Sequence, residues 1–132
     1  MRLFVDTNIF MDVLGKRPGY EASGEVLKSC EDGRNAGCIS ALTVANLNHL
    51  GGRLMSAEQI KSVLQAIMQV FEIEDLTGTD LSRALDSPIH DYEDALQFLA
   101  AKRARADRIV TRNTKDFKNS PIQTITPEIL LQ

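Results

Sequence analysis

Short apolar runs alternate along the chain with segments whose apolar residues recur every three or four positions. The first run, Leu3–Val5, is too short for a helix and is rich in residues that favour strands. After Asp6, the apolar residues between positions 9 and 14 follow helical spacing. The chain therefore begins with a buried strand that ends at Asp6 and leads into a helix.

The same alternation continues to the end of the chain. Start signals for helices are Ser40, Ser56 with Gln59 three residues later, and Thr126 followed by a proline. The pairs Pro18-Gly19 and Gly51-Gly52 separate segments of this pattern. Further strands are expected at 37–39, 70–73, 107–110 and 121–125, and further helices at 20–31, 41–50, 56–69, 79–85, 91–103 and from 126 onward.

The predicted order of strands and helices is β-α-α-β-α-α-β-α-α-β-α-β-α. Strands that alternate with helices indicate a parallel sheet covered by helices on both faces. A length of 132 residues allows one domain with a real core and no second domain. No internal repeat, linker or low-complexity segment interrupts it. We therefore expect a single α/β domain over residues 1–132.

Composition and charge exclude several classes of protein. A hydrophobic share of 43% and a charged share of 25% are ordinary for a globular domain. No apolar run approaches the roughly 20 residues that cross a bilayer, and no signal peptide is recognised. Cys30 and Cys38 are interpreted as free buried thiols, and the two histidines are too few for a zinc cluster. We expect a cytoplasmic protein without a membrane partner.

The net charge of −3 argues against general nucleic-acid binding, but the basic residues are unevenly placed. Seven of the 15 lie between positions 102 and 118, where only two acids accompany them. A local basic stripe on an acidic protein can contact phosphates. The alternative is a solvated helix face with cations at its C-terminal end. The seven residues are Lys102, Arg103, Arg105, Arg108, Arg112, Lys115 and Lys118.

Acids and amides gather where strands end or helices begin. The positions are Asp6 to Asn8, Asn46, Asp91 to Asp94, and Thr111 to Asp116. Carboxylates that share a cleft repel one another unless a cation neutralises them. Hard divalent cations prefer oxygen ligands, polarise phosphoryl oxygens and lower the pKa of bound water. Such a donor set suits Mg²⁺ or Mn²⁺ and hydrolysis of a phosphodiester.

Each of these residues also has a purely structural interpretation. Asp6 could cap the helix that follows it. Asp91 and Asp94 lie three apart in a first helical turn, where they favour the helix dipole. Asp116 could be a turn residue and Asn46 a surface residue of a helix. The occurrence of all of them in this order along an α/β chain favours the metal-site interpretation.

Three segments resemble the motifs of PIN-domain proteins, of the kind found as VapC-type toxins in toxin–antitoxin pairs. They are Phe4–Asp12, Asp91–Leu96 and Ile109–Phe117, and the resemblance extends over essentially the whole chain. It implies a three-layer Rossmann-like fold with a mostly parallel, five-stranded central sheet. It also implies a ribonuclease that depends on Mg²⁺ or Mn²⁺, an antitoxin partner and frequent homodimerisation.

The resemblance also assigns expected roles to individual residues. Asp6, Asp94 and Asp116 match the catalytic, metal-binding acids, and Asp91 is expected to be an accessory metal ligand. Thr111, Asn113 and Asn8 match residues that orient the acids. Arg112, Lys115 and Arg108, from the basic stripe, are expected to hold the RNA backbone.

The chain departs from the family pattern at Asn46, where the family usually places a glutamate. An amide can ligate through its oxygen or hold a water, but it removes one negative charge, which should weaken metal binding. Asp91 could supply the missing charge. Two functions therefore stay open, an endoribonuclease and a PIN-like module that binds RNA or a protein without cleaving. A receiver-like phosphoacceptor is disfavoured because Asp6-Thr7 is not an acidic pair.

Overall fold

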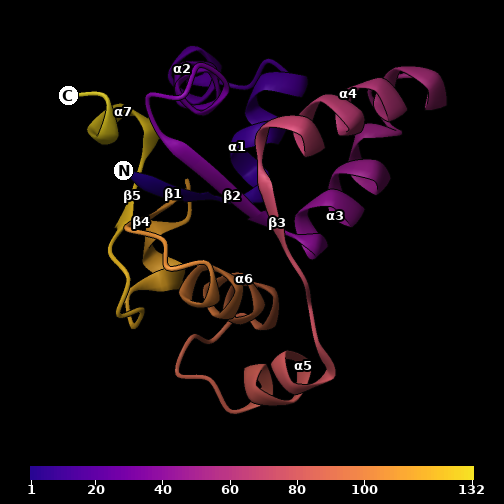
Figure 1. Cartoon of the computed structure of the whole chain (residues 1–132). Coiled ribbons are helices and arrows are strands. Elements are labelled where there is room, and N and C mark those ends of the chain that lie inside the picture. The colour runs from indigo at the N-terminus through magenta and orange to yellow at the C-terminus, as the bar shows by residue number, and fades with distance from the viewer.

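The computed structural model describes residues 1–132 and contains one five-stranded parallel sheet in the order β3-β2-β1-β4-β5. Figure 1 shows this sheet running through the middle of the molecule, between two groups of helices. The strands are β1 (Arg2–Val5), β2 (Ala36–Ser40), β3 (Glu72–Glu74), β4 (Arg108–Val110) and β5 (Thr124–Ile125). The helices are α1 (Thr7–Leu14), α2 (Tyr20–Glu31), α3 (Ala41–Gly51), α4 (Ala57–Val70), α5 (Gly78–Leu85), α6 (Tyr92–Arg103) and α7 (Pro127–Leu130), with a 3₁₀ helix, η1, at Thr114–Phe117.

The order of elements and the parallel sheet confirm the α/β class predicted from the sequence. The strands expected at 70–73 and 121–125 are shifted or shorter. Helix α4 continues through Val70, and Phe71 turns into the core, so β3 pairs only from Glu72 onward. A turn at 118–123 precedes β5, which is reduced to Thr124 and Ile125. In both places, apolar residues that the sequence pattern assigned to a strand pack into the core without pairing with a neighbouring strand.

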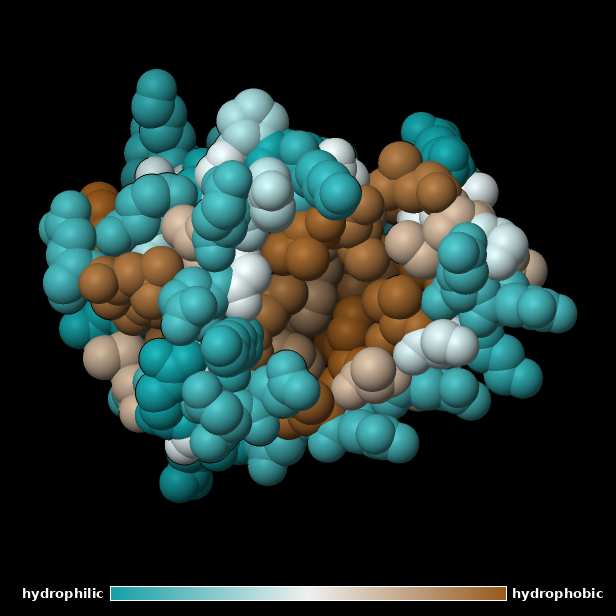
Figure 2. Space-filling view, turned by 90° about the horizontal axis from the view of Figure 1, so that it is seen from above, coloured by the Kyte–Doolittle hydropathy of each residue, from teal (hydrophilic) through white to brown (hydrophobic).

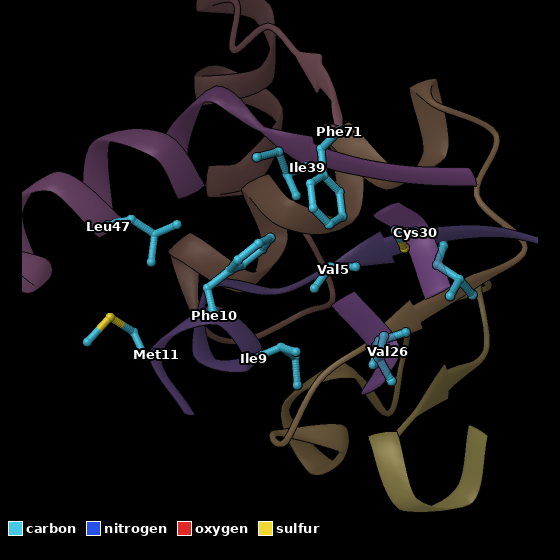
Figure 3. Packing of buried hydrophobic residues seen from close by; sticks show 11 residues of the cluster. Val5, Ile9, Phe10, Met11, Val26, Cys30, Ile39, Leu47 and Phe71 are labelled. Atoms are coloured by element: carbon cyan, nitrogen blue, oxygen red, sulfur yellow. The ribbon is translucent and has the colours of Figure 1, made fainter. Parts of the chain in front are cut away.

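The two faces of the sheet carry separate apolar cores. Alternation along β1 sends Leu3 and Val5 to one face and Phe4 to the other. Helices α1, α2 and α3 cover the first face, where the rings of Phe10 and Phe71 meet edge to face with centroids 5.2 Å apart (Figure 3). The alanine-rich side of α6 covers the second face together with α5. Small alanine side chains let α6 lie close to the sheet.

Helix starts follow the signals in the sequence. Ser56 and Gln59 form a capping box at α4, and the Ser40 hydroxyl accepts a hydrogen bond from the Thr43 N–H at the start of α3. Thr126 caps α7, with Pro127 in its first turn. The Ser40 cap fixes where α3 begins, at the C-terminal end of β2. This position matters because α3 carries Asn46.

Helices α1, α2 and α4 leave an apolar hollow between them, which is visible in Figure 2. This apolar groove has a volume of about 280 Å³ and a single charged residue, Glu31, in its lining. The other residues that line it are Phe10, Val13, Leu14, Leu27, Val63, Ala66, Ile67, Val70 and Phe71. Both cysteines are free and buried, as predicted. None of the helices has the length and apolar character needed to cross a bilayer.

Candidate metal-dependent active site

Asp6 lies at the C-terminal end of β1, in the middle of the sheet, and is almost fully buried. One carboxylate oxygen accepts hydrogen bonds from the Thr7 backbone N–H (2.8 Å) and the Gln97 amide (3.1 Å). The other accepts from the Thr111 hydroxyl (2.7 Å) and the Asn8 amide (3.2 Å). Asp6 thus caps α1 and is also held by side chains from three other places in the chain.

A buried polar network fixes this carboxylate from the α6 side. The Gln97 amide nitrogen donates to the Thr43 hydroxyl (2.9 Å) as well as to Asp6. The Ser40 hydroxyl donates to the Gln97 carbonyl oxygen, and the Thr7 hydroxyl lies 3.1 Å from that of Thr43. All but Thr7 are fully or almost fully buried. Buried polar groups that are all satisfied hold one geometry, so the network orients Asp6 toward a single opening.

That opening, here called the acidic cleft, has a volume of about 200 Å³ and lies at the C-terminal edge of the sheet. Asp94 and Glu93 from α6 and Asn46 from α3 line it together with Asp6. Its other lining residues are Thr7, Asn8, Met11, Arg17, Leu42, Leu50, Gln97 and Asn113. The topology therefore brings together acids that are almost 90 positions apart in sequence.

Asp94 is half-buried in this cleft, and its carboxylate accepts no hydrogen bond from the protein. Burial raises the pKa of Asp94 to about 7, and the negative charges of Asp6, Asp91, Asp116 and Glu93 add to the shift. No cationic side chain is paired with Asp94, so the electrostatic potential around its carboxylate is negative.

Two of the predicted acids lie outside the cleft lining. Asp91 is exposed and caps α6, where its carboxylate accepts the Asp94 backbone N–H at 3.0 Å. Asp116 is exposed on η1, yet its charge still acts on Asp94. No group of three or more His, Cys, Asp or Glu side chains converges at ligating distance. The structure therefore gathers Asp6 and Asp94 in one place and keeps Asp91 and Asp116 at its margin.

The predicted supporting residues fall into two groups. Thr111 and Asn8 both donate hydrogen bonds to Asp6, as their expected role requires. Asn113 lines the cleft, but its side chain makes no hydrogen bond to a carboxylate. Asn46 lines the cleft from α3, and its amide has no partner within the protein. It is half-buried there.

The basic residues expected to hold RNA are placed differently from one another. Arg112 binds Asp12 (Nε to Oδ2, 2.8 Å), both oxygens of Glu128, the Gly19 carbonyl (2.9 Å) and the Ser23 hydroxyl (3.0 Å). These contacts use all five of its N–H donors, so its expected role as an RNA ligand is not supported. Arg108 begins β4, at the end of that strand away from the cleft. Lys115 is exposed on η1 and unpaired.

Sequence reasoning missed Gln97, Glu93 and Arg17. Gln97 lies three residues after Asp94 on the same face of α6, so helical spacing from Asp94 could have identified it, and Glu93 lies one turn before Gln97. Arg17 belongs to the turn after α1, whose Gly and Pro residues gave a loop and no chemistry. Only the fold shows that this loop reaches the cleft.

The family model described as PIN domain matches residues 2–115, which is most of the chain. The chain belongs to the PIN-domain family. The matched region includes Asp6, Asn46, Asp94 and Gln97 and ends one residue before Asp116. No curated protein matches this PIN-domain chain.

Solved structures with the same fold include VapBC proteins and a toxin–antitoxin complex. VapBC2 from Rickettsia felis bound to a promoter DNA fragment matches at 24% identity, with a TM-score of 0.70, over 96% of this chain and 98% of that chain. A toxin–antitoxin complex from Klebsiella pneumoniae matches with the same values. VapBC-1 from nontypeable Haemophilus influenzae matches at 17% identity, TM-score 0.70, over 97% and 99%. At these identities the likeness establishes the shared fold.

The residues of the acidic cleft fit a hard divalent cation. They offer carboxylate and amide oxygens, no thiolate and no imidazole, and this is the donor set of Mg²⁺ or Mn²⁺. Such a cation would neutralise the negative charge of the acids around Asp94. The unpartnered oxygens of Asp94 and of the Asn46 amide are free to become ligands.

Proposed function

We propose that this PIN-domain protein is a divalent-metal-dependent endoribonuclease and the toxin of a toxin–antitoxin pair. The observation that carries the proposal is the meeting of Asp6 and Asp94, from β1 and α6, in one polar cleft at the C-terminal edge of the sheet. Open α/β sheets bind their ligands at this edge. The family and the shared fold of the toxin–antitoxin complexes support it.

Mg²⁺ or Mn²⁺ would be held by Asp6 and Asp94, with Asp116 and the Asn46 amide oxygen as further donors. When bound, such an ion polarises a phosphoryl oxygen and lowers the pKa of a ligand water. The protein contributes orientation: Thr111, Asn8 and Gln97 hold the Asp6 carboxylate in place. Orienting hydrogen bonds of this kind raise metal affinity considerably.

Glu93 is a better replacement for the missing family glutamate than Asp91. Its side chain lines the same cleft as Asn46, is exposed and makes no hydrogen bond that would have to break. Asp91, by contrast, is engaged as the cap of α6. We therefore assign the compensating charge to Glu93, and we expect Glu93→Gln to weaken Mn²⁺ binding more than Asp91→Asn.

The antitoxin is proposed to cover the apolar groove of α1, α2 and α4. An exposed hollow of about 280 Å³ lined almost entirely by apolar side chains is an unusual feature for the surface of a monomer. The complexes that share this fold contain an antitoxin chain, and an amphipathic segment of such a chain would fill the groove. Ala66, in the middle of α4, is the position where added bulk should block it.

A homodimer is proposed as well, through α5. Leu81 and Leu85 are 45% and 75% exposed on this helix, away from both the acidic cleft and the apolar groove. Exposed leucines clustered on one helix commonly mark a protein interface.

The experiment that tests the proposed activity is cleavage of structured RNA by purified protein with Mn²⁺. Wild type should cleave, and chelation of the metal should stop it. Asp94→Asn is the sharper variant, because the Asp94 carboxylate accepts no hydrogen bond and its loss removes charge alone. Asp6→Asn is the second, with a melting curve to confirm folding. Asp75→Asn, an exposed acid outside the cleft, is the matched control. Cleavage that persists in both Asp6→Asn and Asp94→Asn would reject the proposal.

The amide at position 46 favours a second candidate, a PIN module that binds RNA or a protein without cleaving. That protein would retain RNA without turnover and without metal dependence. Asn46→Glu separates the two, because restoring a carboxylate would create metal-dependent cleavage that wild type lacks. Equal cleavage by wild type and Asn46→Glu would exclude this second candidate.

A further inference from the structure

Arg17 is the only cation that lines the acidic cleft. The seven ion pairs of the protein involve Arg2, Arg34, Arg103 and Arg112, and Arg17 is in none of them. Its side chain is exposed and makes no hydrogen bond. An unengaged guanidinium at the mouth of a cleft with three acids is free to bind an anion that enters.

The backbone that carries Arg17 is fixed even though its side chain is not. The Arg17 N–H donates to the Asp12 carbonyl (2.9 Å), and the Arg17 carbonyl accepts from the Tyr20 N–H (3.0 Å). Lys16 and Gly19, on either side, have positive φ values of 47° and 88°. The turn after α1 therefore has a defined shape and presents Arg17 from a constant position.

Arg112 is what holds this turn. Its guanidinium donates to the Gly19 carbonyl at 2.9 Å and to the Asp12 carboxylate at 2.8 Å, so it joins α1 and the residue before α2 to the segment that follows β4. A Cβ at Gly19 would lie 2.7 Å from an Arg112 nitrogen, and the φ of 88° at this position also favours glycine. Arg112 therefore fixes the position of the loop that carries Arg17.

We propose that Arg17 binds a backbone phosphate of the RNA at the acidic cleft, and that Arg112 positions the loop that presents it. The proposal rests on the proposed ribonuclease function, since it names the phosphodiester as the anion. A guanidinium suits this task because its planar donors match phosphate oxygens two at a time. Its positive charge also reduces the repulsion between the entering phosphate and those cleft acids whose negative charge the metal does not neutralise.

The test measures the affinity for a short single-stranded RNA by fluorescence anisotropy over a series of salt concentrations. All proteins carry Asp6→Asn so that the RNA stays intact. Arg17→Ala should weaken binding about 3- to 10-fold and should reduce the slope of log affinity against log salt by about 0.7, the share of one phosphate contact on a single strand. Arg17→Lys should restore most of the slope and less of the affinity. Arg53→Ala, an exposed unpaired arginine outside the cleft, is the matched control and should change affinity less than about twofold.

The role of Arg112 is tested in the same assay. Arg112→Ala should lower the melting temperature and weaken RNA binding, but adding it to Arg17→Ala should cause little further loss, because both act through one contact. Arg17→Ala binding as tightly as its parent, or Arg53→Ala losing as much, overturns the proposal. If wild type cleaves RNA while Arg17→Ala keeps full affinity, this inference fails and the ribonuclease stands. If Arg17→Ala loses affinity while wild type never cleaves with any metal, the phosphate contact stands and the ribonuclease fails.

Discussion

Replacing Asp94 by asparagine should stabilise the metal-free protein while it removes the metal site. Burial and four neighbouring acids raise the pKa of Asp94 from 3.8 to about 7, so its ionised form is unfavourable in the folded state. Each pKa unit corresponds to about 1.4 kcal/mol, giving an upper limit of about 4 kcal/mol. Asp94 is only half-buried, so solvent screening reduces this to about 1–2 kcal/mol. Loss of a favourable charge in the first turn of α6 subtracts about 0.5 kcal/mol.

The assay is thermal unfolding in the presence of a chelator at pH 8 and at pH 5. Because the folded-state pKa is raised, the folded state binds more protons than the unfolded state between about pH 4 and pH 7, and wild-type stability falls as the pH rises through this window. Asp94→Asn should therefore melt about 3–6 °C higher than wild type at pH 8. Its advantage should be smaller at pH 5 than at pH 8, because Asp94 is protonated in the folded protein below its raised pKa.

Addition of Mn²⁺ at pH 8 should reverse the order, because only wild type gains binding free energy from the ion. Asp75→Asn is the control and should show neither effect, since Asp75 lies outside the cleft and does not act on Asp94. Equal melting temperatures of wild type and Asp94→Asn at pH 8, or the same difference at both pH values, would refute the reasoning that charge is concentrated at Asp94.

Three further predictions concern the fold and its surfaces. Gly37→Ala should destabilise the protein by about 1–3 kcal/mol in urea unfolding, because its Cβ would lie 2.5 Å from the Phe71 ring, whereas Gly78→Ala meets open space and should be close to neutral. Arg112→Ala should cost about 2–3 kcal/mol in the same assay, since it leaves the carboxylate of Asp12 buried with only a hydroxyl partner; a loss below about 0.5 kcal/mol would contradict that clamp. Leu85→Asp should convert the proposed homodimer to monomer in analytical ultracentrifugation without lowering the melting temperature, and an unchanged sedimentation coefficient would exclude α5 as the interface.

The fold could be predicted from sequence because its signals are local. Apolar periodicity, the caps at Ser40, Ser56 and Thr126, and the glycine-rich turns together gave the order of elements. The strand at 70–73 was misplaced because Val70 and Phe71 are as apolar as strand residues, and only packing shows that they belong to α4 and to the core. The local sequence pattern does not distinguish an apolar residue that pairs within a strand from one that packs into the core next to the strand.

The candidate site could be predicted only in part. Asp6, Asp94 and Thr111 are identified by their positions at strand ends and helix starts, where parallel topology brings side chains together. Arg112 was misinterpreted because its sequence neighbours are polar, whereas its partners come from α1, α2 and α7. Arg17 was missed for the converse reason, since nothing in its surrounding sequence points to the acids it faces. Partners that are distant in sequence decide whether a cation is structural or available.

The most direct test of the central claim is a calorimetric Mn²⁺ titration of wild type, Asp6→Asn and Asn46→Glu at pH 8. An acidic cleft that is competent for metal despite the amide at position 46 predicts saturable binding by wild type and at least tenfold weaker binding by Asp6→Asn. Asn46→Glu should bind more tightly than wild type, because it adds a carboxylate to the lining. Absence of saturable binding by wild type, or equal affinity of wild type and Asp6→Asn, would contradict the assignment of this cleft as a metal-dependent active site.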